Sequence, residues 1–390
     1  MEVLYSRWWT QCVLLWLSVF LWLNIFGMIG SYFLDPVEDP HAADLVDSSY
    51  TVPGIWFRWD AGHYYSIAAE GYAKHPEDAG FFPLYPLLVG FLSRATGTSI
   101  AIIGFLVSNV SLLISTLLFY RIARNIKDDH IFALRSVLAM LVFPTSFFYF
   151  ALYAESLYLL FALVGTYLAL EKRQFVTSGL ALGISSLARP VGWLLDIVLV
   201  GEFVRRKEFS VKALVSLGLG VFLSGLGIVL YVYYLYRLLG TFLAIPEAQA
   251  AWPRHWAFPW DTYWQGLKIM ATPSLIRENW FVYAMNVCDL MFTTFAAVVI
   301  VISFIWANRK EFPWSLAAYS TVAFLFFLSS QNELPSPLWG MTRWVASLFP
   351  MYFILGNIFK NRKYQVLYFI GSTLILIFFT AWWTSGRWIG

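Results

Sequence analysis

Three chemically reactive side chains stand close together near residue 60. Within the run Trp-Phe-Arg-Trp-Asp-Ala-Gly-His-Tyr-Tyr, an arginine, a carboxylate and an imidazole (Arg58, Asp60 and His63) occur within six positions and among aromatic rings. A carboxylate can accept the proton of a hydroxyl group, and a cation can stabilise a phosphate that departs with negative charge. These residue types indicate chemistry on a polar substrate, provided that other elements hold them at an accessible surface.

The composition of the chain indicates what kind of protein positions these groups. Of the 390 residues, 59% are hydrophobic and 13% are charged, whereas a soluble domain has about 25% charged residues. So apolar a chain indicates an integral membrane protein. The first apolar run, 11–34, is longer than the roughly 7–15 residues of a signal-peptide core, so we expect a retained helix. Cys12 and Cys288 both lie in apolar runs, which argues against a disulfide framework.

Apolar runs of about 20 residues predict the membrane crossings. We expect an all-α polytopic protein with about eleven transmembrane helices. Two of them, 174–190 and 191–204, are short arms that meet at Arg189-Pro190, either as thin crossings or as a re-entrant hairpin. The run 81–94 contains Pro83 and Pro86 and is predicted to be an interfacial helix. The other crossings are predicted at 12–33, 99–122, 134–152, 155–171, 212–238, 281–307, 313–330, 343–359 and 364–383.

The distribution of positive charge predicts the orientation of the chain. Most of the 26 Lys and Arg residues fall in short loops on one side of this layout, notably 121–135 and 205–212. Lys and Arg are enriched in cytoplasmic loops, so that side is predicted to be cytoplasmic. The long polar stretches 35–80 and 240–280 then face the outside or a lumen, together with Asp60. The acidic residues of 35–47 are expected to form a solvated loop without metal-ligand spacing.

An extracytoplasmic position limits the chemistry that Asp60 can serve. ATP and nucleotide sugars are cytoplasmic, and the chain has no Gly-rich phosphate loop. An enzyme on the outer face needs an activated donor that is carried in the membrane, and lipid-phosphate sugars meet this requirement. Glycosyl transfer with inversion needs one carboxylate to deprotonate the acceptor hydroxyl and a cation to stabilise the departing phosphate.

Four groups of residues follow one another along the chain. They are Arg-Trp-Asp-Ala-Gly-His-Tyr at 58–64 with Ile-Ala at 67–68, Glu-Gly-Tyr at 70–72 and Phe-Pro-Leu-Tyr-Pro at 82–86, Phe-Pro-Thr-Ser-Phe-Phe at 143–148 with Tyr-Ala-Glu-Ser at 153–156, Leu-Ala-Arg-Pro-Val-Gly at 187–192, and Arg343-Trp344 before Phe349-Pro350. In this order they resemble the motifs of one known family, the GPI mannosyltransferase 2 (PIG-V-like) family. The resemblance spans about residues 1–360, and the run around Asp60 is its most specific part. In the third group Ala188 replaces the family's threonine, and in the last Trp344 replaces its tyrosine.

This resemblance implies a GT-C glycosyltransferase fold. We expect one transmembrane domain over residues 1–390, with interfacial helices in a first extracytoplasmic loop at 35–98 and a second large loop at 240–280. The implied reaction moves mannose, with inversion, from a polyprenyl- or dolichyl-phosphate mannose to a hydroxyl of a lipid-linked or glycan acceptor. No cofactor, metal or nucleic-acid partner is expected. Because the chain is shorter than the eukaryotic relatives, we expect a prokaryotic plasma membrane rather than the endoplasmic reticulum.

The resemblance implies that Asp60 is the general base. We expect Arg189, Arg343 and His63 to bind the donor phosphate, since an arginine among apolar segments is costly unless it faces a charged partner or a cavity. Five further residues are expected to support the substrate: Arg58, Trp59, Tyr64, Glu155 and His255.

Several of these residues also have an alternative role, and His63 could be a partner for the Asp60 carboxylate or a plain interfacial histidine. Asp60 could cap a helix predicted over 61–70, which Gly71 would end. Arg58 and Arg343 could be headgroup anchors, and Glu155 could be a first-turn acid that the helix dipole favours. Arg189 could pair with a buried acid. The acids considered for that pair are Asp196 and Asp289. The tryptophans of 252–264 could form an interfacial aromatic belt or stack on sugar or lipid, and Arg254 and His255, which lie among them, could reach the donor phosphate.

Two rival functions remain at this point. A lipid or solute transporter would also have many helices and buried arginines, but it predicts repeated halves with interrupted helices at matching positions. We find no internal repeat, and only 174–204 looks interrupted. A related GT-C transferase that moves a different lipid-phosphate sugar has the same sequence features.

Overall fold

Long apolar segments form the framework of the protein. The computed structural model describes residues 7–34, 51–207, 209–250, 252–359 and 361–389. Five of its helices, of 23 to 35 residues, are long and apolar enough to cross a membrane, because each residue adds about 1.5 Å and a bilayer core is about 30 Å thick. They are α2 (Trp8–Phe33), α5 (Ile100–Ile126), α10 (Val211–Leu239), α13 (Ser274–Asn308) and α17 (Arg362–Thr384).

Shorter helices fill the space between these five. Three of them are apolar and have 10–17 residues, namely α6, α8 and α14. The chain is therefore a multi-pass membrane protein, as predicted, whereas the predicted number of about eleven crossings stays a prediction. The other helices, in chain order, are α3 (Ala61–Glu70), α4 (Leu84–Thr96), α6 (His130–Leu141), α7 (Glu155–Tyr167), α8 (Phe175–Ala188), α9 (Asp196–Arg206), α11 (Ala244–Gln249), α12 (Pro259–Met270), α14 (Trp314–Leu328), α15 (Met341–Ala346) and α16 (Pro350–Ile358).

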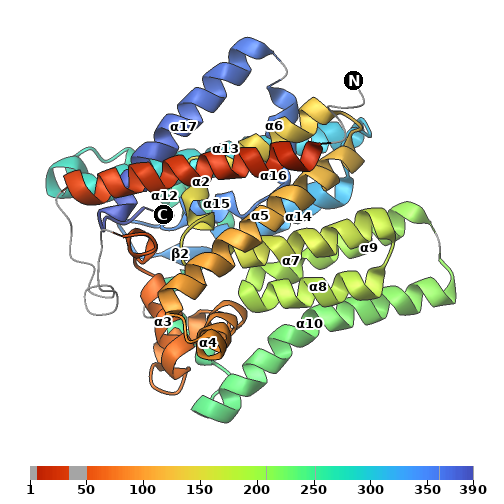
Figure 1. The fold of residues 1–390 in the computed structure, drawn as a ribbon, viewed down its shortest axis with the longest axis horizontal. Coiled ribbons are helices and arrows are strands. Elements are labelled where there is room, and N and C mark those ends of the chain that lie inside the picture. Colours follow the sequence, from red (N-terminus) through yellow and green to blue (C-terminus); the bar gives the residue numbers. More distant parts are fainter. Residues whose placement is uncertain (1–6, 35–50, 208, 251, 360, 390) are drawn as a thin grey trace.

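Helices distant in the sequence pack side by side (Figure 1). In Figure 1, α8 lies between α7 and α10, with α10 along the lower edge, and α2 crosses the upper part of the molecule against α17. Between α8 and α10 the backbones meet directly, because a Cβ atom on Gly179 would fall 2.0 Å from the carbonyl oxygen of Gly220. Small residues permit such close helix contacts in membranes.

Two predicted crossings are wrong as continuous helices. The segment 134–152 ends its helix at Leu141 and continues through a turn and a short 3₁₀ segment, η3 (Ser146–Tyr149). The segment 343–359 is divided between α15 and α16. Pro144 and Pro350 each lack a backbone N–H donor, so neither can continue the hydrogen bonding of a helix that precedes it, and Pro350 is the first residue of α16.

The segment 174–204 bends where its sequence predicts. Helix α8 ends at Ala188, and the 3₁₀ segment η5 (Pro190–Leu195) leads the chain into α9, which contacts α8. Helix α8 has 14 residues and α9 has 11, so each is about 21 Å long or less and does not span a 30 Å core alone. The bend brings Arg189 to the junction of two short arms.

The polar stretches contain short elements that cover one end of the bundle. The first stretch contains α3 and the 3₁₀ segment η2 (Pro76–Gly80), and α4, which follows it, is a short helix as predicted for 81–94. The second stretch contains α11, α12 and a strand, β1 (Arg254–Trp256), that pairs antiparallel with β2 (Ser330–Asn332). This sheet was not predicted. The acidic residues of 35–47, predicted to form a solvated loop, lie outside the described residues.

Candidate active site

Asp60 stands immediately before α3, but its carboxylate does not cap that helix. Helix α3 begins at Ala61 and ends at Glu70, and Gly71 follows with a φ of 78°, all as predicted. The Asp60 side chain makes no capping hydrogen bond, and its Oδ2 lies 2.5 Å from Arg343 Nη1 instead. The Asp60 side chain therefore stands at the start of the helix without capping it, and the capping alternative is wrong.

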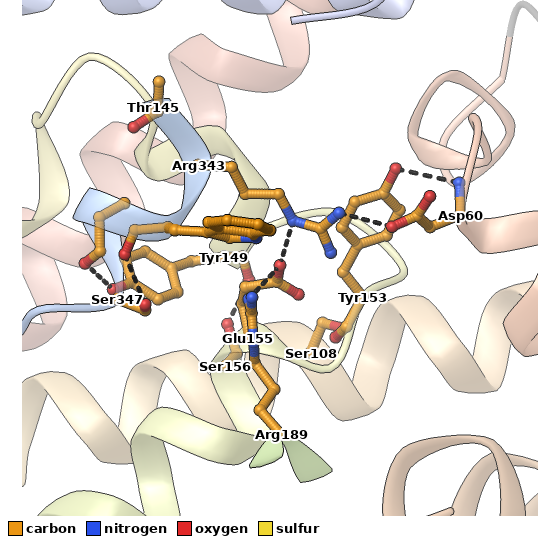
Figure 2. A network of polar contacts seen from close by, with 12 residues as sticks. Asp60, Ser108, Thr145, Tyr149, Tyr153, Glu155, Ser156, Arg189, Arg343 and Ser347 are labelled. Atoms are coloured by element: carbon orange, nitrogen blue, oxygen red, sulfur yellow. Dashed lines mark hydrogen bonds and ion pairs between the residues drawn. The ribbon is translucent and has the colours of Figure 1, made fainter. Parts of the chain in front are cut away.

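Arg343 joins two carboxylates from different parts of the chain (Figure 2). Its Nη1 donates to Asp60 Oδ2, and its Nε donates to Glu155 Oε1, each at 2.5 Å. The guanidinium carbon also lies 4.5 Å from the ring centroid of Tyr153, a cation–π contact. An arginine held by two acids and a ring is a fixed part of this site, so the headgroup-anchor alternative does not describe it.

Glu155 is the centre of the ionic network. It is the first residue of α7, where the helix dipole favours an acid. Its Oε1 accepts hydrogen bonds from both Arg343 and Arg189, the latter at 2.6 Å, and its side chain is only 3% exposed. The structural alternative predicted the wrong acids for Arg189, because Arg189 pairs with Glu155 and not with Asp196 or Asp289.

Tyr153 connects this network to the loop that carries Asp60. Its hydroxyl group donates to the backbone oxygen of Arg58 at 3.1 Å and accepts from the backbone N–H of Asp60 at 3.2 Å. The Arg58 guanidinium is buried and donates to backbone oxygens of Gly54, Phe57 and Thr384. Arg58 is therefore neither exposed to lipid headgroups nor directed at a substrate, and it attaches the Asp60 loop to the end of α17.

His63 lies one turn along α3 and pairs with an acid that sequence reasoning missed. Its Nδ1 lies 2.6 Å from Oδ1 of buried Asp78, in η2, and its ring stacks on Phe81 with centroids 4.5 Å apart. Burial lowers the pKa of His63, but the hydrogen bond that His63 donates to Asp78 and the negative charge of Asp60 outweigh this effect, so the pKa is raised above 6.5. Asp78 lies 15 residues after His63 in the same polar loop. This shared loop is the only feature of the sequence that pointed to Asp78.

A cavity of about 1000 Å³ opens beside these groups. Six of the predicted site residues line it, whereas Arg58, Glu155 and His255 do not. Its walls also carry seven tryptophans, so a polar end and a large apolar, aromatic surface share one space. The six predicted residues are Trp59, Asp60, His63, Tyr64, Arg189 and Arg343.

Strand β1 presents Arg254, and not His255, to this cavity. Successive side chains of a strand point to opposite faces, and His255 is exposed on the face away from the cavity. Arg254 lines the cavity, donates from Nη2 to the backbone oxygen of Trp339 at 3.2 Å, and lies over the ring of Trp344. Of the two residues that could reach the donor phosphate, the structure thus places Arg254 at the cavity, and the prediction for His255 is corrected because the sequence did not reveal the strand.

The tryptophans of 252–264 divide into two groups. Trp252 lines the cavity and contacts the ring of His63, with centroids 5.5 Å apart. Trp256, Trp260 and Trp264 are each more than half exposed. The belt predicted from their spacing thus describes three of the four, and Trp252 belongs to the cavity.

The arrangement provides a carboxylate, several cations and an apolar wall around one cavity. The carboxylate can accept a proton, and the cations can hold an anionic group. The tryptophans can contact a hydrocarbon chain. Among the residues that the structure describes, no three His, Cys, Asp or Glu side chains come together in a way that could hold a metal ion.

The similar chains found among solved structures include two from Archaeoglobus fulgidus. One is an oligosaccharyltransferase tethered with an acceptor peptide, with a TM-score of 0.48, 13% identity, and coverage of 96% of this chain and 55% of that chain. The other is an archaeal oligosaccharyltransferase in complex with an inhibitory peptide and a dolichol-phosphate, with a TM-score of 0.42, 11% identity, and coverage of 96% and 56%.

Comparison of sequences identifies nearer relatives. A GPI mannosyltransferase 2 of Cryptococcus neoformans var. neoformans serotype D, found in two strains, is 29% identical over 175 residues. That match covers 42% of this chain and 40% of the relative, so it spans less than half of either protein. The family described as mannosyltransferase (PIG-V) matches residues 9–265, which is more than half of the chain and includes Asp60, His63, Glu155 and Arg189. The chain belongs to the mannosyltransferase (PIG-V) family.

Proposed function

We propose that this protein is an inverting GT-C mannosyltransferase that uses a polyprenyl- or dolichyl-phosphate mannose as donor. The acceptor is a hydroxyl group of a lipid-linked or glycan molecule. Family membership supports the fold, the sugar and the reaction class. The observation that carries the mechanism is the position of Asp60: its carboxylate lines the cavity, is 18% exposed, and is oriented by Arg343 and not by its own helix.

The proposed reaction proceeds in one displacement. Asp60 takes the proton of the acceptor hydroxyl, and the freed oxygen attacks C1 of mannose from the face opposite the phosphate. The bond between C1 and the phosphate oxygen breaks, and the lipid phosphate leaves with its electron pair. Arg189, Arg343 and His63 line the same cavity as Asp60, so we place the donor phosphate at this polar end and the lipid chain along the tryptophans.

The position of the basic loops supports an extracytoplasmic site. The first residue of α2, Trp8, stacks with Tyr120 and lies under the guanidinium of Arg121, at the start of the basic loop. Near its other end, Gly27 accepts a hydrogen bond from Thr384, and the backbone of Thr384 accepts one from Arg58. The two ends of α2, which has 26 residues, are about 39 Å apart. The basic loop and the Asp60 loop therefore lie at opposite ends of a spanning helix, and by the positive-inside rule the cavity faces away from the cytoplasm.

We further propose that residues 1–390 act as one transmembrane domain, in which the described parts of the loops 35–98 and 240–280 form part of the cavity wall. Elements of both loops line it, among them Trp59, Phe81, Gln249 and Trp252. A prokaryotic plasma membrane is the proposed location, although the similar GPI mannosyltransferase 2 proteins are fungal.

Replacing Asp60 tests the mechanism. Asp60→Asn keeps the shape of the side chain and removes the proton acceptor, so we expect transfer from lipid-linked mannose to fall by about 10²–10⁴-fold. Asp261→Asn is the matched control, because Asp261 is exposed at the start of α12 and does not line the cavity. Near-normal turnover of folded Asp60→Asn protein rules out Asp60 as the base.

A further inference from the structure

Most charges around the cavity are already balanced within the protein. Arg343 bonds Asp60 and Glu155, and Arg189 bonds Glu155, so two cations meet two acids. His63 pairs with Asp78. An anionic ligand that approaches this part of the cavity finds no excess of positive charge.

Two other arginines line the same cavity without an acid. Within the part of the chain that the structure describes, neither Arg254 nor Arg387 forms an ion pair. The Arg387 Nη1 donates to the Ser385 hydroxyl oxygen at 2.7 Å. Arg254 is less satisfied: its Nη1 is buried and has no hydrogen-bond partner among the described residues.

A buried guanidinium nitrogen that lacks a hydrogen-bond acceptor is unfavourable. Burial, opposed in part by the negative charge of Asp60, lowers the pKa of Arg254 to about 10, so the group is still charged at neutral pH. An unpaired buried donor loses its hydration without gaining a bond in return. A ligand that brings a negative oxygen to Nη1 restores that interaction.

The surroundings of Arg254 fix its guanidinium in place. Strand pairing of Arg254 with Asn332 holds the backbone, and the Trp344 ring lies 4.5 Å below the guanidinium carbon. Gly340, with a φ of 94°, permits this approach, because a Cβ there would lie 3.3 Å from Arg254 Nη2. The guanidinium of Arg254 is thus held by a rigid support and does not belong to a mobile surface side chain.

We infer that Arg254 binds the phosphate of a lipid-phosphate ligand in this cavity. It supplies a positive charge that no acid among the described residues balances, whereas the charges of Arg343 and Arg189 are balanced by Asp60 and Glu155. This inference rests on the proposed function for the identity of the ligand. In the reaction proposed above, a phosphodiester with one negative charge becomes a phosphomonoester that carries up to two. Arg254 therefore interacts more strongly with the departing phosphate than with the intact donor, which is the condition for an interaction that accelerates the step.

Binding of dolichyl phosphate to the purified full-length protein in lipid nanodiscs tests this inference without requiring turnover. Arg254→Met keeps an apolar stem over Trp344 and removes the charge, and we expect it to weaken binding by about tenfold to a hundredfold, as for loss of one charge-assisted hydrogen bond. Arg254→Lys keeps the charge but loses the planar fork, so a smaller loss is expected. Arg277→Met is the matched control, since Arg277 is an exposed arginine of α13 that does not line the cavity.

Dolichol, which lacks the phosphate, separates charge recognition from recognition of the lipid chain. We expect Arg254→Met and the wild type to bind dolichol equally well. Equal binding of dolichyl phosphate by the wild type and folded Arg254→Met overturns the inference, and so does a loss in Arg387→Met without a loss in Arg254→Met. If the wild type binds dolichyl phosphate in an Arg254-dependent way but transfers no mannose, the inference stands and the proposed function fails.

Discussion

The guanidinium of Arg343 lies 2.5 Å from the carboxylate of Asp60, although 283 positions separate the two residues in the sequence. The proposed base is therefore positioned by a residue of α15 and not by the helix that it precedes. The same guanidinium bonds Glu155 at the start of α7. One side chain thus holds together three elements that meet at the cavity. Replacing it is expected to affect both catalysis, through Asp60, and packing, through Glu155.

Arg343→Lys tests the importance of the two-sided contact. A lysine ammonium is a point charge and cannot bond two carboxylates in the planar geometry of a guanidinium. We expect kcat to fall by about tenfold to a hundredfold with a smaller change in KM, because a charge-assisted bond that orients the base is lost. Steady-state transfer assays with Arg277→Lys as control measure this. A change in KM alone contradicts a positioning role.

Glu155→Gln leaves Arg189 and Arg343 without their shared carboxylate. Breaking a buried ion pair by neutralising one partner destabilises a protein by about 3–5 kcal/mol, so we expect a clear decrease in the thermal unfolding midpoint of the solubilised protein. Glu333→Gln, at an exposed position near β2, is expected to melt like the wild type. If Glu155→Gln melts at the same temperature as Glu333→Gln, the network does not stabilise the fold.

The sequence predicts helices well where composition and capping agree. Helix α3 matches its predicted bounds, and Gly71 follows it because a positive φ favours glycine there. Prediction fails where an apolar run is interrupted, as at Pro144 and Pro350, because apolar composition indicates a crossing whether or not the backbone is continuous. Irregular backbone at membrane depth is tolerated where it is buried in protein or lines a cavity. One apolar run of the sequence does not show whether its backbone lines a cavity in the folded protein.

For the site, charge in an apolar chain was the informative signal. Asp60 was predicted as a candidate from its neighbouring residues and the family resemblance, and Arg189 because an arginine between apolar segments is costly without a partner. The structure brings both of them, together with Arg343, to one cavity. The sequence did not show whether Arg254 or His255 faces the cavity, because the β1–β2 pairing joins segments about 75 residues apart in the sequence. The structural role of Arg58 was missed for a similar reason, since its partner Thr384 is 326 residues away.

Tyr153→Phe isolates the hydroxyl group that supports the Asp60 loop. The phenyl ring keeps its contact with the Arg343 guanidinium, while the hydrogen bonds to Arg58 and Asp60 are lost. Each hydrogen bond contributes about 0.5–1.5 kcal/mol, so kcat/KM is expected to fall by about fivefold to a hundredfold. Tyr263→Phe removes a hydroxyl that bonds Thr294, outside the cavity, and serves as control. An unchanged kcat/KM in Tyr153→Phe shows that the loop holds Asp60 without this hydroxyl.

The His63–Asp78 pair predicts a dependence of stability on pH. The pKa of His63 is raised above its ordinary value of 6.5, so protonated His63 stabilises the folded state. That contribution is fully present below about pH 6.5 and is lost as the pH rises through the raised pKa. We expect Asp78→Asn to lower the unfolding midpoint at pH 6 and to have a smaller effect at pH 9. Thermal unfolding at both pH values measures this, and an equal effect at both contradicts an ionic contribution from His63.

Gly340→Ala tests the support of Arg254 from the backbone. Alanine is strained at a φ of 94°, and its Cβ would lie 3.3 Å from Arg254 Nη2 and 3.4 Å from the Trp344 ring. Gly97→Ala is the matched control, since Gly97 has a φ of 67° but nothing lies within 4 Å of the added Cβ. Both variants are expected to lose about 1–2 kcal/mol of stability from the left-handed backbone. Only Gly340→Ala is expected to weaken binding of dolichyl phosphate as well, because only its methyl group displaces the guanidinium. Equal binding by the two variants means that Arg254 does not need this fixed position to hold the phosphate.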